Sequence, residues 1–255
     1  VWFKSCTVTA DRGIFGCYTN VNDRTYIRIN YPSTDSSITI FTKIGGVAKT
    51  YLKTGAVLRD PSAWYHLVLA VDTTQATPAN RAKLYINGSR ITDFSTETYP
   101  EQDVDEPLLS EPTQSVGALH GGGGFGEYWD GYLAEFHFID GTQLTPSSFG
   151  EAGDYGDWKP IEVTGLTYGN NGFYLDFADA ADLGDDESGN GNDFTENVIA
   201  ASDQMLDSPT NNFCTLNPLF LYSGVSGDGV FSEGNLKLVD DGNHLGNGAT
   251  FGVSS

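Results

Sequence analysis

The sequence is poor in cysteine and in basic residues, and each shortage excludes a class of protein. Three cysteines (Cys6, Cys17 and Cys214) in 255 residues are too few for a disulfide-built scaffold, and their odd number leaves one unpaired. Cys6 and Cys17 flank a turn-like stretch and could face each other across a hairpin, but we favour three reduced thiols. Only 13 lysines and arginines stand against 34 acidic residues, giving a formal net charge of −21. A surface with this much negative charge repels nucleic acid and anionic membranes, and we therefore expect neither as a partner.

Long apolar runs and helical periodicity are missing as well. No signal peptide is recognisable, and no stretch approaches the roughly 20 apolar residues that span a bilayer, so we expect no membrane insertion. No long segment repeats apolar residues at helical spacing. The 31 glycines, 13 tyrosines and 15 phenylalanines suit pleated strands joined by tight turns, which predicts an all-β protein. Because the chain opens inside a strand-like run, Val1–Lys4, we expect it to be a piece of a longer protein.

Short strand-like runs recur at regular intervals over residues 1–150, which is typical of a β-sandwich. The clearest, Trp64–Asp72, is nearly all apolar and predicts a central, buried strand. Lys83–Gly88 follows it and ends in Asn87-Gly88, the strongest short signal for a type I′ hairpin turn. In Tyr132–Ile139, alternation predicts one strand with Tyr132, Ala134, Phe136 and Phe138 facing the core. Two stacked antiparallel sheets should then bury Trp64, Leu67, Leu69, Val71, Phe136 and Phe138.

Two motifs in this region resemble one known superfamily. The first is Trp64–Asp72 followed by Lys83–Gly88, and the second is Tyr128–Asp140 followed by Leu144–Phe149. Their order and spacing are similar to those of the laminin-G-like (LamG), concanavalin A-like lectin/glucanase superfamily. The resemblance implies an all-β, concanavalin A-like jelly-roll sandwich of two antiparallel sheets with a loop-rich C-terminal extension. We place the sandwich at residues 1–180, and a linker leading into a second, mostly absent β domain at residues 181–255.

Segments downstream carry a second resemblance. Gly165–Phe177, Asp186–Thr195 and Asp207–Phe213 resemble long structural proteins of tailed bacteriophages, in which a LamG-like domain precedes a SPRY-like one. Thr250–Ser255 resembles the first strand of that SPRY-like domain. The resemblance implies a tail fibre, spike or head decoration protein that is assembled in the host cytoplasm and lies on the extracellular virion surface. Its implied partners are other virion proteins and further copies of itself, as a trimer in a fibre.

A glycine-rich aromatic loop at residues 120–131 is the candidate carbohydrate site. Tyrosine and tryptophan stack on the C–H faces of sugars, aspartate and histidine hydrogen-bond to hydroxyls, and glycines let a ligand approach the backbone. For Trp129, packing beneath the sheet is the favoured alternative, whereas both interpretations stay open for Phe125 and Tyr128. The candidate carbohydrate-binding residues are His120, Phe125, Tyr128, Trp129 and Asp130.

A second loop places oxygen-bearing side chains at alternating positions around glycines. Hard cations such as Ca²⁺ prefer an oxygen array of this kind. The loop is not an EF-hand, because Asn197 stands where the bidentate glutamate would be. An Asx-rich tight turn that satisfies its own backbone explains the same pattern. The candidate Ca²⁺ ligands are Asp186, Ser188, Asn190, Asn192 and Asp193.

Catalytic signatures are the last absence. The sequence has no strand with the clustered carboxylates of concanavalin-like glucanases, and no metalloprotease, serine hydrolase or phosphate-loop motif. Glu135 and His137 share a strand face, but a lone pair of this kind is more often structural. We therefore expect a non-catalytic module that binds host-surface or environmental glycans. The alternatives are a purely structural virion protein and, less favoured, an endoglycosidase.

Overall fold

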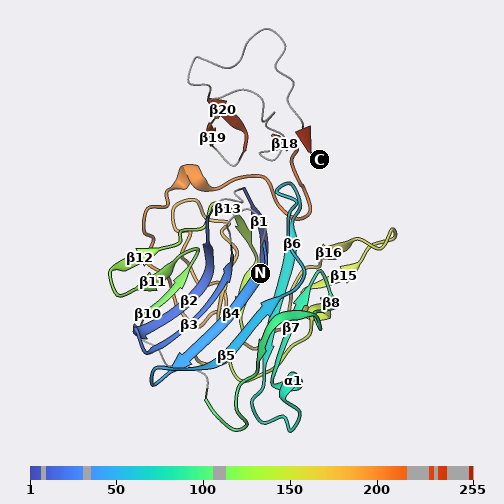
Figure 1. Ribbon diagram of the computed structural model, residues 1–255. Helices are drawn as coiled ribbons and strands as arrows, with labels where there is room; N and C mark the ends of the chain where they lie inside the picture. The colour runs from blue at the N-terminus through green and yellow to red at the C-terminus, as the bar shows by residue number, and fades with distance from the viewer. Residues whose placement is uncertain are drawn as a thin grey trace, which may run out of the picture.

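The computed structural model describes residues 1–6, 10–30, 36–105, 113–216, 230–232, 235–239 and 253–254. Its two main sheets are antiparallel and stack as the layers of a sandwich (Figure 1). The six-stranded sheet has the order β10 (Thr113–Val116), β2 (Arg12–Asn20), β3 (Asp23–Ile29), β4 (Ile38–Ile44), β5 (Val47–Thr54), β9 (Phe94–Thr98). The five-stranded sheet has the order β13 (Gly131–Ala134), β1 (Trp2–Ser5), β6 (Tyr65–Val71), β7 (Ala82–Ile86), β8 (Ser89–Arg90).

The remaining elements are short. Two-stranded pairings join β11 (Leu119–Gly121) to β12 (Gly124–Gly126), β14 (Phe136–Phe138) to β17 (Phe173–Leu175), β15 (Gly150–Ala152) to β16 (Trp158–Pro160), β18 (Thr215–Leu216) to β21 (Val253–Ser254), and β19 (Val230–Ser232) to β20 (Lys237–Val239). The one α-helix among the described residues is the single turn α1 (Pro78–Arg81). In the described part of the chain, no helix has the length and apolar character needed to cross a membrane. The prediction of an all-β sandwich of antiparallel sheets is confirmed.

Alternating side chains of the two sheets form the main core between the layers. From the six-stranded sheet come Phe15, Ile27, Ile40 and Leu52, and from the other sheet come Phe3, Leu67 and Leu84. Strand β6 is central, as its apolar run predicts, and His66 on its opposite face is buried too. Leu67 and Phe136 are buried as predicted, and so is Trp64, in a second cluster with Trp2 and Tyr132. Leu69, Val71 and Phe138 are only half-buried, unlike the prediction for them.

The prediction of one continuous strand at Tyr132–Ile139 is wrong. Glu135 has a positive φ of 51°, a left-handed conformation that interrupts an extended strand. Strand β13 before it pairs with β1, and strand β14 after it pairs with β17. The interruption also resets the alternation of side chains. As a result Tyr132 joins the second cluster whereas Phe136 faces the main core.

The predicted type I′ turn is present between β7 and β8. Asn87 and Gly88 have φ angles of 47° and 76°, and Ile86 pairs with Ser89 across the turn. Glycine is required at the second position for another reason as well. A Cβ atom on Gly88 would lie 2.5 Å from the Trp158 ring, so no side chain fits there.

A buried ion pair fastens the segment that follows the sandwich to β1. Lys4 Nζ lies 2.9 Å from Asp207 Oδ2, and the two side chains are 0 % and 2 % exposed. Lys4 also donates to Asn212 Oδ1 at 2.8 Å and to the Phe213 carbonyl at 3.1 Å. The indole Nε1 of Trp64 donates to Asp207 Oδ1 at 2.9 Å. Residues 207–213 therefore lie against the outer side of the five-stranded sheet and neutralise a charge that has no water around it.

All three cysteines are free; Cys6 and Cys17 are buried and Cys214 is exposed. Of the segment that resembles a SPRY-like first strand, Thr250–Ser255, only Val253–Ser254 lie within the described residues, where they form β21.

Candidate functional site

The site is built on the outer face of the six-stranded sheet. Alternation along β3 sends Thr25, Ile27 and Ile29 inward, where they are buried, and leaves the residues between them half-exposed on the outer face. The same period of two applies along β4 and β5. The outward side chains of these three strands include Arg24, Tyr26, Arg28, Phe41, Lys43, Tyr51 and Lys53.

Three aromatic rings form a row across the strands. Tyr26 on β3 is paired in register with Phe41 on β4, and Phe41 is paired with Tyr51 on β5. The Tyr26 and Phe41 rings are stacked with centroids 5.1 Å apart, and Phe41 and Tyr51 meet edge to face at 5.5 Å. Because adjacent strands lie about 4.8 Å apart, this aromatic row is about 10 Å long. It is a half-exposed apolar platform in the middle of a polar face.

Basic side chains border the aromatic row on both sides. Arg24 is paired in register with Lys43 on one side, and its guanidinium lies 5.9 Å from the centre of the Phe41 ring. On the other side, Arg28 lies 5.0 Å from the centre of the Tyr26 ring. Arg28 also pairs with Asp11 at 3.1 Å and Glu127 at 3.2 Å. Burial raises the pKa of Tyr26 although both arginines act to lower it, so its hydroxyl stays a donor at neutral pH.

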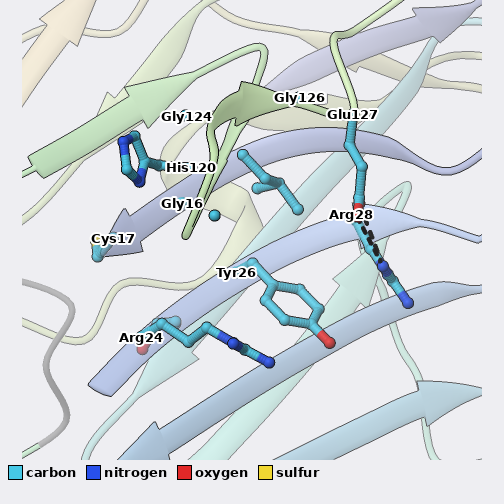
Figure 2. Close-up of a pocket in the computed structure, with 12 residues that line it drawn as sticks. Gly16, Cys17, Arg24, Tyr26, Arg28, His120, Gly124, Gly126 and Glu127 are labelled. Carbon is cyan, nitrogen blue, oxygen red and sulfur yellow. Dashed lines mark hydrogen bonds and ion pairs between the residues drawn. The ribbon is translucent and has the colours of Figure 1, made fainter. Parts of the chain in front are cut away.

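A glycine-rich hairpin, β11 and β12, closes one end of this face. It can approach because β2 carries glycines beneath it: a Cβ on Gly13 would lie 2.5 Å from Leu119 and one on Gly16 would lie 3.0 Å away. Between the hairpin and β3 lies an open cavity of about 320 Å³. Figure 2 shows Arg24, Tyr26 and Arg28 along the cavity floor, with His120 and Glu127 contributed by the hairpin side.

The structure brings together some of the residues proposed from the sequence for sugar binding. His120 lines the cavity, and its ring lies 4.5 Å from that of Tyr18 and 4.9 Å from that of Phe125. Its Nδ1 is buried and has no hydrogen-bonding partner among the described residues. Phe125 and Tyr128 are 40 % and 47 % exposed, so both are open to a ligand.

Trp129 and Asp130 have structural contacts instead. The Trp129 ring packs edge-on against Phe3 of the core, with centroids 5.6 Å apart, which is the packing role weighed for it from the sequence. Asp130 forms an ion pair of 3.6 Å with Arg12, and its carbonyl accepts a hydrogen bond from the backbone N–H of Cys6. Neither side chain lines the cavity.

The residues on the floor of the cavity were not among those proposed from the sequence. The run Asp23-Arg-Thr-Tyr-Ile-Arg-Ile29 alternates polar or aromatic residues with buried ones, and this alternation alone could have placed Arg24, Tyr26 and Arg28 on one face. Their proximity to Phe41 and Tyr51 depends on the register between strands, and the register cannot be predicted from the sequence of one strand.

The candidate calcium loop is closed by its own hydrogen bonds. Asp186 Oδ1 accepts from the backbone N–H of Tyr174 and Ser188, and Oδ2 accepts from the Ser188 hydroxyl and the Asn192 N–H, at 2.8–2.9 Å. Asn190 and Asn192 donate to backbone carbonyls, and Asp193 accepts from the Asp186 N–H. Burial acts to raise the pKa of Asp186, but the hydrogen bonds, led by that from Tyr174, outweigh it and hold the pKa below its usual value.

This arrangement is the Asx-rich turn weighed from the sequence, because four donors already occupy the acceptor sites of one carboxylate. No group of three or more histidine, cysteine or acidic side chains that could hold a metal occurs among the described residues. Calcium binding at this loop stays a prediction.

Glu135 and His137 do lie together, within an aromatic cluster. His137 Nε2 is 3.6 Å from Glu135 Oε2, and Tyr174 donates its hydroxyl proton to the same oxygen at 2.6 Å. The imidazole stacks on Tyr174, with centroids 4.2 Å apart, and its Nδ1 is 2.8 Å from the Tyr168 hydroxyl. Burial lowers the pKa of His137, whereas Glu135 acts to raise it. The pair is packed into the structure and is not a lining of the cavity.

Of the comparisons with known proteins, the match to a family model agrees with this fold. No curated protein matches the chain. The chain is similar to the native heptameric SAP-like pentraxin from Limulus polyphemus with 18% sequence identity and a TM-score of 0.33, over 51% of this chain and 57% of that one. The match therefore spans less than two thirds of the pentraxin. Residues 1–148 match the family Laminin_G_3, described as concanavalin A-like lectin/glucanases superfamily. Since this match covers more than half of the chain, the protein belongs to the concanavalin A-like lectin/glucanase superfamily.

Proposed function

We propose that this protein is a non-catalytic carbohydrate-binding module. Its saccharide lies along the aromatic row and ends in the cavity beneath the β11–β12 hairpin. The observation that carries the proposal is the continuity of the two features, since Tyr26 belongs to the row and also lines the cavity.

The chemistry of the face suits a sugar. Aromatic rings offer flat apolar surfaces to the C–H faces of pyranose rings, and a few polar groups at fixed positions give orientation. Here those polar groups are the Arg24 guanidinium and the Tyr26 hydroxyl, with the His120 ring at the cavity wall. The glycines of the hairpin (Gly121, Gly124 and Gly126) leave backbone groups accessible at the cavity wall.

A glycan array tests the proposal with three variants. The wild type should bind a defined set of glycans, and Tyr26→Ala should lose most of that binding because it removes the platform shared by row and cavity. Tyr128→Ala should weaken binding less, since Tyr128 does not line the cavity. Tyr155→Ala is the matched control, because this tyrosine is fully exposed on another part of the chain. Absence of any glycan ligand would overturn the proposal.

We further propose that the module is part of a phage appendage. The support is the resemblance of the downstream segments to tailed-phage structural proteins. Antibody labelling of phage particles in electron micrographs tests this, and labelling confined to host material would contradict it.

A second candidate function, a structural virion protein that binds no sugar, is favoured by one observation. Between residues 198 and 206, the extension after the sandwich exposes four large apolar side chains, Val198, Ile199, Met205 and Leu206. Exposed apolar groups gathered in one segment suit packing against neighbouring subunits. Assembly of this kind predicts an oligomer, trimeric in a fibre, and a stable monomer of the full-length protein at micromolar concentration would count against it. Binding on the glycan array decides between the two functions.

A further inference from the structure

Charge is distributed very unevenly between the six-stranded sheet and the rest of the chain. The six strands of the larger sheet carry six basic residues and only two acidic ones, Asp23 and Glu97. The whole chain has 13 basic and 34 acidic residues. Nearly half of all positive charge therefore belongs to one sheet of a strongly negative protein. The six basic residues are Arg12, Arg24, Arg28, Lys43, Lys49 and Lys53.

These charges border the same surface on which the sugar is proposed to lie. Strand register places Arg24 beside Lys43 on one side of the aromatic row, and Arg28 and Lys53 on the other, with Thr39 between them. Arg28 is neutralised by Asp11 and Glu127. Arg24 donates only to the Val21 carbonyl, so its positive charge at the cavity has no acidic partner among the described residues.

We infer that the ligand of this face is an acidic polysaccharide, whose carboxylate or sulfate groups pair with Arg24 and Lys43 while its rings lie on Tyr26 and Phe41. This inference rests on the proposed function. A guanidinium binds oxyanions such as carboxylate through two parallel hydrogen bonds, and the Arg24 guanidinium lies 5.9 Å from the centre of the Phe41 ring. The negative remainder of the protein repels the same polymer, so binding is confined to this sheet.

Single-stranded nucleic acid is the other polymer that combines negative charge with stacking rings. Its charge density is the argument against it. One phosphate per nucleotide brings a long run of closely spaced charges next to a protein of net charge −21, whereas a polysaccharide that is charged on only some of its sugars has fewer charges along the same length.

The test compares polymers that share one backbone: neutral dextran, carboxymethyl-dextran and dextran sulfate of matched length. The wild type should bind at least one charged form at least tenfold more tightly than neutral dextran, and the affinity should fall as salt rises. Preference for the carboxymethyl form identifies carboxylate as the recognised group, and preference for the sulfated form identifies sulfate.

Two double variants separate recognition from overall charge. Arg24→Gln/Lys43→Gln should weaken binding of the preferred polymer at least tenfold. Arg59→Gln/Lys159→Gln makes the same change in net charge away from the sheet and should change the affinity less than twofold. Equal losses in the two variants, equal affinity for charged and neutral dextran, or tighter binding of oligo(dT) would each overturn the inference. If any of these results is found but neutral glycans bind on the array, the inference about acidic ligands fails while the proposed carbohydrate-binding function still holds.

Discussion

The buried pair of Lys4 and Asp207 gives the sharpest prediction about stability. Asp207→Ala leaves the Lys4 ammonium without its counter-charge at a site that is 0 % exposed. It also removes the acceptor of the Trp64 indole N–H. Removing one partner of a buried ion pair typically costs 3–5 kcal/mol, because the remaining charge is neither hydrated nor paired. We expect a loss of about 4 kcal/mol in the free energy of unfolding.

Urea denaturation followed by tryptophan fluorescence measures this loss directly. At ~2–4 °C per kcal/mol for a chain of this size, the melting temperature should fall by about 8–16 °C. Asp105→Ala is the control, since Asp105 is exposed, and it should change stability by less than about 0.5 kcal/mol.

A paired substitution identifies the cause. Lys4→Met/Asp207→Leu removes both charges and fills a similar volume, so it should be more stable than Asp207→Ala alone. If the double variant is as unstable as the single one, the loss comes from packing and not from an uncompensated charge. A cost below about 1 kcal/mol for Asp207→Ala would refute the reasoning altogether.

Three further predictions concern the calcium loop, acid stability and catalysis. Asp186→Ala should lower the free energy of unfolding by about 3 kcal/mol even with chelator present, because it removes four hydrogen bonds from the loop. If the loop also binds Ca²⁺, millimolar Ca²⁺ should raise the wild-type melting temperature by a few degrees, and chelation should reverse the rise. Burial lowers the pKa of His66 from 6.5 to about 2, so the unfolded chain takes up a proton that the folded one refuses, and stability should fall as the pH drops from about 6.5 toward 2. His66→Asn, which can still accept from Trp158, should show a shallower fall in a urea titration at pH 7 and pH 5. Neither the wild type nor Glu135→Gln should release reducing sugar from polysaccharides, since the Glu135 carboxylate is hydrogen-bonded to Tyr174.

Patterns within one strand or one turn predicted the fold well. The apolar run Trp64–Asp72 and the Asn87-Gly88 turn depend on neighbours in sequence, and both are found where they were expected. The strand at Tyr132–Ile139 failed because nothing in its alternation marks the left-handed Glu135. The pattern of polar and apolar side chains does not reveal a non-glycine residue with a positive φ.

The candidate site could be predicted only in part, for a related physical reason. The glycine-rich hairpin was visible because glycines and aromatics are adjacent in sequence, and it supplies His120 to the cavity. The floor of the cavity is assembled from three strands, and Tyr26, Phe41 and Tyr51 become neighbours through hydrogen-bond register alone. Side chains that meet across a sheet are a property of the whole fold.

The concentration of basic residues in one layer of the sandwich makes the molecule a large electric dipole. A protein of net charge −21 is expected to drift away from negative surfaces, yet this one experiences a torque that turns the six-stranded sheet toward them. The rotation acts within about one Debye length, roughly 8 Å at physiological ionic strength. Molecules that reach an anionic wall therefore arrive in one orientation, with the aromatic row facing it. Near physiological ionic strength, where the Debye length is shorter than the molecule, protein bound to an anionic surface should share that single orientation.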